Sequence, residues 1–202
     1  MKLIYLKEID STQKYLISKL KSSNLFPPIC VWSDYQTNGI GSRGNKWIGK
    51  RGNLFFSFAY YKNEFNVPLE SLSIYFGWLF KKSLNKLGSN VVMKWPNDIY
   101  LIDKEPKKIG GVITNIVRDF VVCGIGLNTS YSPLKEFGCL DIKVKNDKIL
   151  QNFFDMDFPS WEEVFCEYKR EFKRTGTFLG IEGKLLNDGS LEKNGQRIYS
   201  NR

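Results

Sequence analysis

Three short stretches combine cationic, amide and glycine residues in spacings suited to an anionic ligand. They are Gly39-Ile-Gly-Ser-Arg-Gly44, Lys94-Trp-Pro-Asn-Asp98 and Lys107-Lys-Ile-Gly-Gly111. Glycines allow backbone N–H groups to approach an anion closely, and nearby lysine or arginine adds positive charge. Groups of this kind can neutralise the charge that develops during nucleotidyl transfer. The stretches therefore predict a site that holds phosphate or carboxylate groups.

The chain has no histidine. This excludes Ser-His-Asp and Cys-His nucleophilic catalysis, imidazole acid–base steps and zinc sites with histidine ligands. The cysteines, Cys30, Cys123, Cys139 and Cys166, include no C-x-x-C pair that would suggest zinc or thiol redox chemistry. They are typical of reduced, mostly buried thiols in a cytosolic protein. Proton transfer must therefore use carboxylates, lysine, tyrosine or the phosphates of a substrate.

The glycines at 39–44 match the G-x-G-x-x-G pattern of dinucleotide-binding proteins, but their context differs. That fingerprint needs a preceding strand, a helix that opens at the third glycine and an acidic residue about 20 positions later. Here a basic loop continues through Lys46 to Gly52 and enters an apolar strand, so no helix opens. Two interpretations remain, an anion-binding loop and a flexible surface loop.

The elements that must position these stretches follow from apolar periodicity and turn signals. Helices are expected to begin at Asp10-Ser11-Thr12, to cover residues 69–87, and to run from a capping box at Ser160 and Glu163 to residue 174. Strands are expected at 29–35, 54–61, 91–95, 109–117 and 120–126, with the last two forming a hairpin. This order predicts an α+β fold, a mostly antiparallel sheet with helices on one side.

The C-terminal part changes in character at Gly176. Asn187-Asp188-Gly189 and Asn194-Gly195 are hairpin signals between very short strands. We therefore expect a catalytic domain over residues 1–175 and a two- or three-stranded β appendage over 176–202, too small to fold alone. No stretch approaches the ~18 apolar residues of a membrane span, and the N-terminus lacks a signal-peptide core. A cytoplasmic protein without a membrane partner is expected.

Composition indicates a folded chain with an anionic partner. Apolar residues make up 42% of the 202 positions and aromatic residues 15%, which is enough for a sizeable core. Thirty Lys and Arg against 21 Asp and Glu give a net charge of +9. The charge favours nucleic acid, an acidic protein or a phosphate-bearing small molecule, although a lysine-rich composition bias explains it as well. A basic nucleic-acid-binding module is thus an alternative, but no RRM or zinc-finger signature supports it.

Five blocks in fixed order resemble the biotin protein ligase family. They are Asp10-Ser11-Thr12, Gln36-x-x-Gly39-x-Gly41 with Arg43, Gly44 and Trp47, Lys94-Trp-Pro-Asn-Asp98, Lys108-x-Gly-Gly111, and Gly124-x-Gly126-x-Asn128. The resemblance covers residues 5 to 175, and the Lys-Trp-Pro-Asn-Asp run is its most specific piece. It implies a fold related to the catalytic cores of class II aminoacyl-tRNA synthetases and lipoyl ligases.

The resemblance implies a two-step ligase that uses biotin, ATP and Mg²⁺. Biotin and Mg-ATP would give biotinyl-5′-adenylate and pyrophosphate, and the acyl group would then pass to a lysine of biotin carboxyl carrier protein. This chemistry suits a chain without histidine, because the biotin carboxylate is already an anionic nucleophile. The obstacle is its repulsion by the triphosphate, which cations and backbone N–H groups reduce. A lipoate–protein ligase is the nearest alternative.

The resemblance also implies roles for individual residues. Lys108, Arg43 and Asp98 would be catalytic, with Lys108 bridging the biotin carboxylate and the α-phosphate and Asp98 receiving the proton of the incoming lysine. Asn97 and Asp98 would hold Mg²⁺. The biotin-binding set would be Ser11, Thr12, Gln13, Gln36, Gly39, Gly41, Trp47, Lys108, Gly111 and Gly126. The ATP- or adenylate-binding set would be Ile40, Gly41, Ser42, Arg43, Trp47, Lys94, Asn97, Asp98, Lys108 and Asn128.

The sequence departs from the family pattern in three places. Ile40 and Ser42 stand where the glycine loop usually carries basic residues, Gln13 replaces the usual Asn after Ser-Thr, and the C-terminal β-barrel of many relatives is shortened. Charge-assisted contacts contribute roughly 1.5–3 kcal/mol each, so the loop change predicts weaker retention of the adenylate. Because the first block begins at Asp10, we expect no helix-turn-helix and no operator-DNA binding. A monomer or weak homodimer is also expected.

Overall fold

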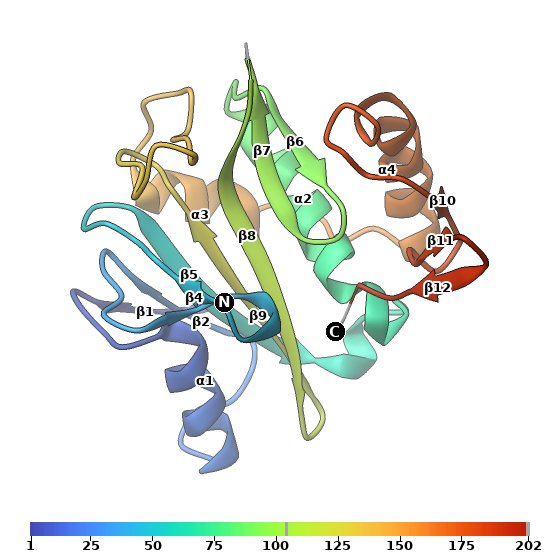
Figure 1. Ribbon diagram of the computed structural model, residues 1–202. Helices are drawn as coiled ribbons and strands as arrows, with labels where there is room; N and C mark the ends of the chain where they lie inside the picture. Colours follow the sequence, from blue (N-terminus) through green and yellow to red (C-terminus); the bar gives the residue numbers. More distant parts are fainter. Residues whose placement is uncertain (104, 201–202) are drawn as a thin grey trace.

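A seven-stranded sheet forms the centre of the computed structural model, which describes residues 1–103 and 105–200 (Figure 1). The last two residues of the expected appendage lie outside that range. In spatial order the strands are β1 (Lys2–Leu6), β2 (Ile29–Ser33), β5 (Leu54–Tyr61), β9 (Phe120–Leu127), β8 (Pro106–Val117), β7 (Asp98–Ile102) and β6 (Val91–Lys94). Only β1 and β2 pair in parallel; every other neighbouring pair in this sheet is antiparallel.

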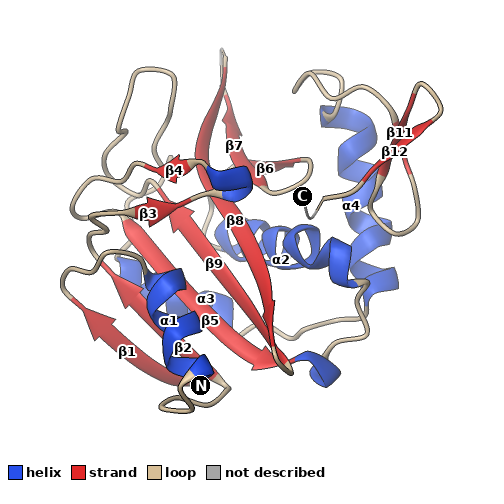
Figure 2. Cartoon of the chain, turned by 60° about the horizontal axis from the view of Figure 1, so that its bottom comes forward, coloured by secondary structure: helices blue, strands red, loops and turns tan. Residues whose placement is uncertain are grey.

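Helices cover both faces of this sheet. The helices α2 (Leu72–Lys86), α3 (Asn146–Phe154) and α4 (Trp161–Thr175) pack on one side, whereas α1 (Thr12–Lys21) packs on the other (Figure 2). Strand alternation explains the division, because Phe56 and Phe58 of β5 join the α2 core while Ala59 joins the cluster under α1. The α+β fold is therefore confirmed, and α1 is the exception to the expectation of helices on one side.

The larger core is aromatic. Phe56 and Phe58 of β5 meet Phe80 and Phe153 at ring-centroid distances of 5.5 to 5.9 Å, and Phe76 meets Phe58 at 5.1 Å. Aromatic pairs of this kind contribute about 0.5–1.5 kcal/mol each beyond the burial of their area. This core fixes α2 and α3 to the sheet, so the opposite face has a rigid support.

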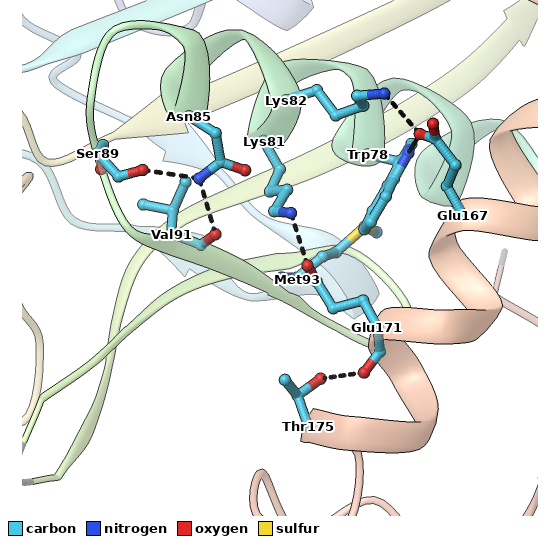
Figure 3. A network of polar contacts seen from close by, with 10 residues as sticks. All are labelled: Trp78, Lys81, Lys82, Asn85, Ser89, Val91, Met93, Glu167, Glu171 and Thr175. Atoms are coloured by element: carbon cyan, nitrogen blue, oxygen red, sulfur yellow. Dashed lines mark hydrogen bonds and ion pairs between the residues drawn. The ribbon is translucent and has the colours of Figure 1, made fainter.

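A buried ion pair connects two helices to β6, the edge strand of the sheet. Glu171 of α4 accepts from Lys81 Nζ of α2 at 2.6 Å and from the backbone N–H of Met93 on β6 at 2.9 Å (Figure 3). The Glu171 residue is 4% exposed and Lys81 is 9% exposed. Removing one member of a buried pair typically costs about 3–5 kcal/mol, because the other charge remains unpaired. The pair therefore ties α2, α4 and the edge strand into one unit.

The C-terminal segment folds as a small sheet of its own. Its strands β10 (Lys184–Leu185), β11 (Leu191–Lys193) and β12 (Gln196–Ile198) are antiparallel, which confirms the expected C-terminal β appendage of two or three strands and gives it three. The predicted turns at 187–189 and 194–195 lie between these strands. Leu185 and Leu191 belong to the larger core, so the appendage packs against the main domain.

The glycine-rich loop folds into a short hairpin. Its strands β3 (Gly39–Ile40) and β4 (Lys46–Trp47) pair antiparallel, and a 3₁₀ turn over Ser42–Gly44 joins them. Arg43 has φ 58° and Gly44 has φ 75° at the tip. A second 3₁₀ turn covers Lys62–Glu64, and a third, Leu69–Ser71, leads into α2. Within the described ranges, no helix has the length and apolar character needed to cross a membrane.

Candidate active site

A cavity of about 310 Å³ opens on the α1 face of the sheet. The N-terminus of α1, the β3–β4 hairpin and the loop after β9 form its walls, and strands β8 and β9 form its floor. The floor is flat because three glycines lie on these neighbouring strands. Gly111 pairs with Gly126, and Gly124 pairs with Ile113. A flat floor of this kind allows a ligand to approach the backbone closely.

A side chain would crowd all three floor positions, most severely at Gly124 and Gly126. A Cβ on Gly126 would lie 2.6 Å from Trp47 Cε2, and one on Gly124 would lie 2.5 Å from Gln13 Oε1. At Gly111 the nearest Trp47 atom would be 3.2 Å away. Trp47 of the hairpin therefore covers the floor, and its Nε1 is buried with no hydrogen-bond partner among the described residues.

The inner end of the cavity is polar and ordered. Ser11 caps α1, which confirms the predicted helix start. Gln36 Oε1 accepts from Thr12 N at 2.8 Å and from Thr12 Oγ1 at 3.1 Å, and Thr12 Oγ1 lies 2.9 Å from Ser57 Oγ. Because its oxygen is occupied in this way, Gln36 retains its Nε2 group as a donor for a ligand.

Gln13 supplies the complementary acceptor. Its Nε2 donates to Asn115 Oδ1 at 3.0 Å and to the Val122 carbonyl at 3.2 Å, which fixes the amide orientation. Its Oε1 is buried and has no partner among the described residues. A buried acceptor without a partner is costly, so such groups often mark ligand sites. The inner end thus offers one fixed donor, on Gln36, and one fixed acceptor.

The outer end of the cavity is ionic. Lys108 Nζ lies 2.7 Å from Asp98 Oδ1, with the two side chains 25% and 22% exposed. The same Nζ is 5.7 Å from the centre of the Trp47 ring. Burial, and then the charge of Asp98, raise the pKa of the neighbouring Tyr100, so its hydroxyl stays protonated at neutral pH.

The turn that carries Asp98 is attached to the next strand. Asn97 Nδ2 donates to the Val112 carbonyl at 2.7 Å, and Val112 N donates to the Asn97 carbonyl at 2.8 Å. These bonds hold the β6–β7 turn against β8, beside the ion pair. The sequence placed Asn97 and Asp98 at the end of a strand, and the structure places Asp98 at the start of β7.

Most of the predicted site residues line this cavity. They are Ser11, Thr12, Gln13, Gln36, Ile40, Gly41, Ser42, Trp47, Asn97, Asp98, Lys108, Gly111, Gly126 and Asn128. Three predicted residues do not line it. Gly39 lies against Gln36 and the Trp47 carbonyl. Arg43 lines a neighbouring depression. Lys94 places its Nζ 5.2 Å from the centre of the Tyr100 ring.

Sequence reasoning missed several wall residues. Ser57 is a hydroxyl between two phenylalanines of an apolar strand, and this interruption is the signal that could have revealed it. Pro133 and Phe137 come from the loop after β9, where no periodicity or motif marks them. Asn45 and Ile48 belong to the hairpin, whose fold was not predicted.

The donor set does not form a resident metal site. Within residues 1–103 and 105–200 no three His, Cys, Asp or Glu side chains cluster, and Asp98 is the one carboxylate in the cavity wall. Mg²⁺ commonly uses one or two carboxylates together with substrate phosphates. The donors therefore fit an ion that arrives with a nucleotide, and coordination by Asn97 and Asp98 stays a prediction.

Cysteine chemistry is absent from this part of the chain. No cysteine lines the cavity. Cys30 and Cys123 are buried in the sheet, and burial raises the pKa of both thiols. Both therefore stay protonated and inert at neutral pH, whereas Cys139 is partly buried and Cys166 is exposed.

Comparison with known proteins decides the family. The model of the Biotin/lipoate A/B protein ligase family matches residues 5–128, a range that holds both the polar and the ionic ends of the cavity. This chain belongs to that family.

Two similar proteins illustrate the relationship. A crystal structure of biotin acetyl coenzyme A carboxylase synthetase from Helicobacter pylori with bound biotinylated ATP superposes with a TM-score of 0.89 at 36% identity, covering 98% of this chain and 99% of that one. The bifunctional ligase/repressor BirA of Salmonella typhimurium is 33% identical over an alignment of 138 residues, and the match covers 63% of this chain and 41% of that protein.

More distant relatives share the fold. Biotin protein ligase from Aquifex aeolicus, solved in complex with biotin and ATP, has a TM-score of 0.74 at 24% identity and covers 100% of this chain and 96% of that one. The chain spans about two fifths of the length of the bifunctional ligase/repressors it matches, at 41% and 40%.

Proposed function

We propose that this chain is an ATP-dependent biotin–protein ligase. The observation that supports it best is the likeness, over 99% of that chain's length, to a Helicobacter pylori synthetase with biotinylated ATP bound. The cavity adds physical support, because its polar end, flat floor and ionic end suit a ring, an acyl chain and a phosphate in that order.

The first proposed step joins biotin to AMP. A carboxylate oxygen of biotin attacks the α-phosphorus of Mg-ATP, and pyrophosphate leaves. No base is needed, because the carboxylate is already ionised. Lys108 reduces the repulsion between the two anions, and Asp98 holds the ammonium in place until they bind. Trp47 packs over the product and excludes water from the activated acyl group.

The second proposed step transfers the acyl group. The ε-amine of an acceptor lysine attacks the carbonyl carbon of the adenylate, the bond to the phosphate oxygen breaks, and AMP leaves. Asp98 is the carboxylate of the cavity wall that can accept the proton of the amine. The Helicobacter pylori relative is a biotin acetyl coenzyme A carboxylase synthetase, so we propose the biotin carboxyl carrier protein of that carboxylase as the acceptor.

The polar end favours biotin over lipoate. The ring urea of biotin has N–H donors and a carbonyl acceptor, which complement Gln13 Oε1 and Gln36 Nε2. The dithiolane ring of lipoate has neither, so it would leave both amides unpaired. Each such loss costs about 1–3 kcal/mol, and sites built for hydrogen bonding reject analogues that lack the polar group.

The proposal includes a setting. The reaction takes place in the cytoplasm, where ATP and carboxylases are found, and the net charge of +9 suits ATP and an acidic carrier. The protein acts as a monomer or weak homodimer and binds no operator DNA. Sedimentation at micromolar concentration, with and without operator-like DNA, tests the oligomeric state and the absence of DNA binding together.

A mass measurement tests the proposed activity. A carrier domain is incubated with the protein, Mg-ATP and either biotin or lipoate, and its mass is determined. We expect the addition of one biotinyl group, which requires ATP and the carrier lysine. Modification with lipoate alone would reassign the substrate, and no modification with either acid would refute the proposal.

A further inference from the structure

The turn between β10 and β11 is attached to the main domain by three consecutive carbonyls. Each accepts from a side chain of a different element. The donors are Trp161 Nε1 to Asn187 O at 3.1 Å, Ser71 Oγ to Asp188 O, and Trp95 Nε1 to Gly189 O at 2.8 Å. Because the three donors come from three separate segments of the main domain, this turn has a defined position on it.

Gly189 shows how closely the turn is seated. Its φ is 79°, in the left-handed region, and a Cβ there would lie 2.8 Å from Ile74 Cδ1 and 3.1 Å from Ser71 Oγ. A side chain at this positive φ would be strained and would crowd Ile74 and Ser71, so we expect a substitution to shift the turn. The carbonyl that accepts from Trp95 therefore has a fixed position.

Trp95 links this turn to the cavity. It follows β6 directly, is 8% exposed, and precedes Asn97 and Asp98 by two and three residues. β6 is the last strand of the seven-stranded sheet and pairs with β7 alone, so it needs support from outside the sheet. Glu171 supports the strand through Met93 and Asn85 supports it through Val91 (Figure 3), and Gly189 adds a bond through Trp95, at the end that leads to the cavity.

The β6–β7 turn is thus held from two sides. Asn97 bonds to Val112 on the inner side, and Trp95 bonds to Gly189 on the outer side. Asp98, which leaves this turn, pairs with Lys108 in the cavity. The inner bonds and the pairing of Asp98 with Lys94 and Gly111 remain when the outer bond is lost, so we expect a small shift of the turn that changes the distance between the carboxylate and the ammonium.

We infer that Trp95 is a positioning residue. Through the Trp95 indole, the turn at residues 187–189 fixes the position of Asp98 at the ionic end of the cavity. The inference rests on the proposed function for its kinetic readout, but it also predicts a change in backbone dynamics that needs no substrate. Misplacement of reacting groups by 1 Å can cost about 100-fold in rate, so partial release is expected to lower kcat for adenylation about tenfold.

Two matched variants test it in the full chain. Trp95→Phe and Trp161→Phe each remove one indole N–H that donates to this turn, and each keeps an aromatic ring. Only Trp95 is followed closely by residues that line the cavity, Asn97 and Asp98. We expect similar losses of Tm. Trp95→Phe alone should lower kcat for biotin-dependent pyrophosphate–ATP exchange about tenfold, a partial loss of positioning, while KM for biotin stays unchanged.

Hydrogen exchange separates this inference from the proposed function. The amides of residues 97–99 should exchange faster in Trp95→Phe than in wild type or Trp161→Phe. If the wild type shows no pyrophosphate exchange, the proposed function fails while the amide result still decides the inference. Gly189→Ala, which displaces the accepting carbonyl, is the second variant and should give the same signature. Wild-type kcat and amide exchange in both Trp95→Phe and Gly189→Ala would overturn the inference.

Discussion

Asp98 on β7 and Lys108 on β8 share the cavity face of the sheet because β8 contains a bulge of one extra residue. Asp98 pairs with Gly111, whereas Tyr100 pairs with Lys108, so the register shifts by one residue and Ile109 is the addition. In a regular strand Lys108 would share the face of Val112, which is buried in the larger core. The bulge turns the lysine to the other face, where its Nζ lies 2.7 Å from Asp98.

Loss of the Lys108 ammonium should abolish adenylation without unfolding the protein. Lys108→Ala is expected to reduce biotin-dependent pyrophosphate–ATP exchange by at least about 100-fold, the scale on which a charge-stabilising group acts. Lys107→Ala is the matched control, because Lys107 is the exposed neighbour on the same strand. Exchange in Lys108→Ala within a few-fold of the control would remove Lys108 from the mechanism.

Substitution of the floor glycines should weaken biotin binding in proportion to the clash. A methyl group on Gly126 would lie 2.6 Å from Trp47, whereas one on Gly111 would lie 3.2 Å from it. Titration calorimetry should therefore show a much larger loss of affinity for Gly126→Ala than for Gly111→Ala. Equal affinities in the two variants and the wild type would mean that the packing of Trp47 on the floor does not shape the biotin site.

A cation restored to the hairpin should slow the escape of the adenylate. Ser42 lines the cavity, at a position where the resemblance described above implies a basic residue. One charge-assisted hydrogen bond contributes about 1.5–3 kcal/mol, so Ser42→Arg should slow adenylate release at least tenfold, measured by rapid filtration. Ser42→Ala is the control and should release it at the wild-type rate. A Ser42→Arg rate equal to that of Ser42→Ala contradicts the prediction.

The contribution of Asp188 to stability should depend on pH. Burial raises the pKa of Asp188, but hydrogen bonds from Ser190 and the Arg197 guanidinium outweigh this and hold it below the ordinary 3.8. The stabilisation is therefore present above 3.8 and is lost as pH falls through the lower pKa of the folded state.

Thermal unfolding across pH tests this sign. Asp188→Asn should lower Tm at neutral pH, and the difference from wild type should narrow as pH falls below 3.8. Glu192→Gln, at an exposed position of the neighbouring β11, is the control and should shift Tm little at any pH. Parallel curves for Asp188→Asn and the wild type would show that the carboxylate has no special role.

Much of the fold was predictable because its signals are local. The strand at 54–61 was predicted with its observed ends, and the capping box at Ser160 marks the start of α4. The strands β1 and β7 and the helix α3 were not predicted. β7 is a short strand between the stretches Lys94–Asp98 and Lys107–Gly111, where the motifs drew attention away from strand periodicity. The helix α3 is short and is stabilised by its contact with β5 and α2 rather than by strong signals of its own.

The site was predictable in content but not in geometry. Motif order identified most of the residues in the cavity wall. The expected strand began at residue 109, and strict alternation carried back to Lys108 would put it on the opposite face, because alternation along a strand cannot reveal a bulge. The link from Gly189 to Trp95 joins residues far apart in sequence, and no local pattern announces it.

Oxygen transfer tests the central claim most directly. Biotin labelled with oxygen-18 in its carboxylate is converted with Mg-ATP and the carrier domain, and the released AMP is analysed by mass spectrometry. Direct attack of the carboxylate on the α-phosphorus places one labelled oxygen in each AMP, and this is the result we predict. AMP without label, formed while the carrier is biotinylated, would contradict an acyl-adenylate in this cavity.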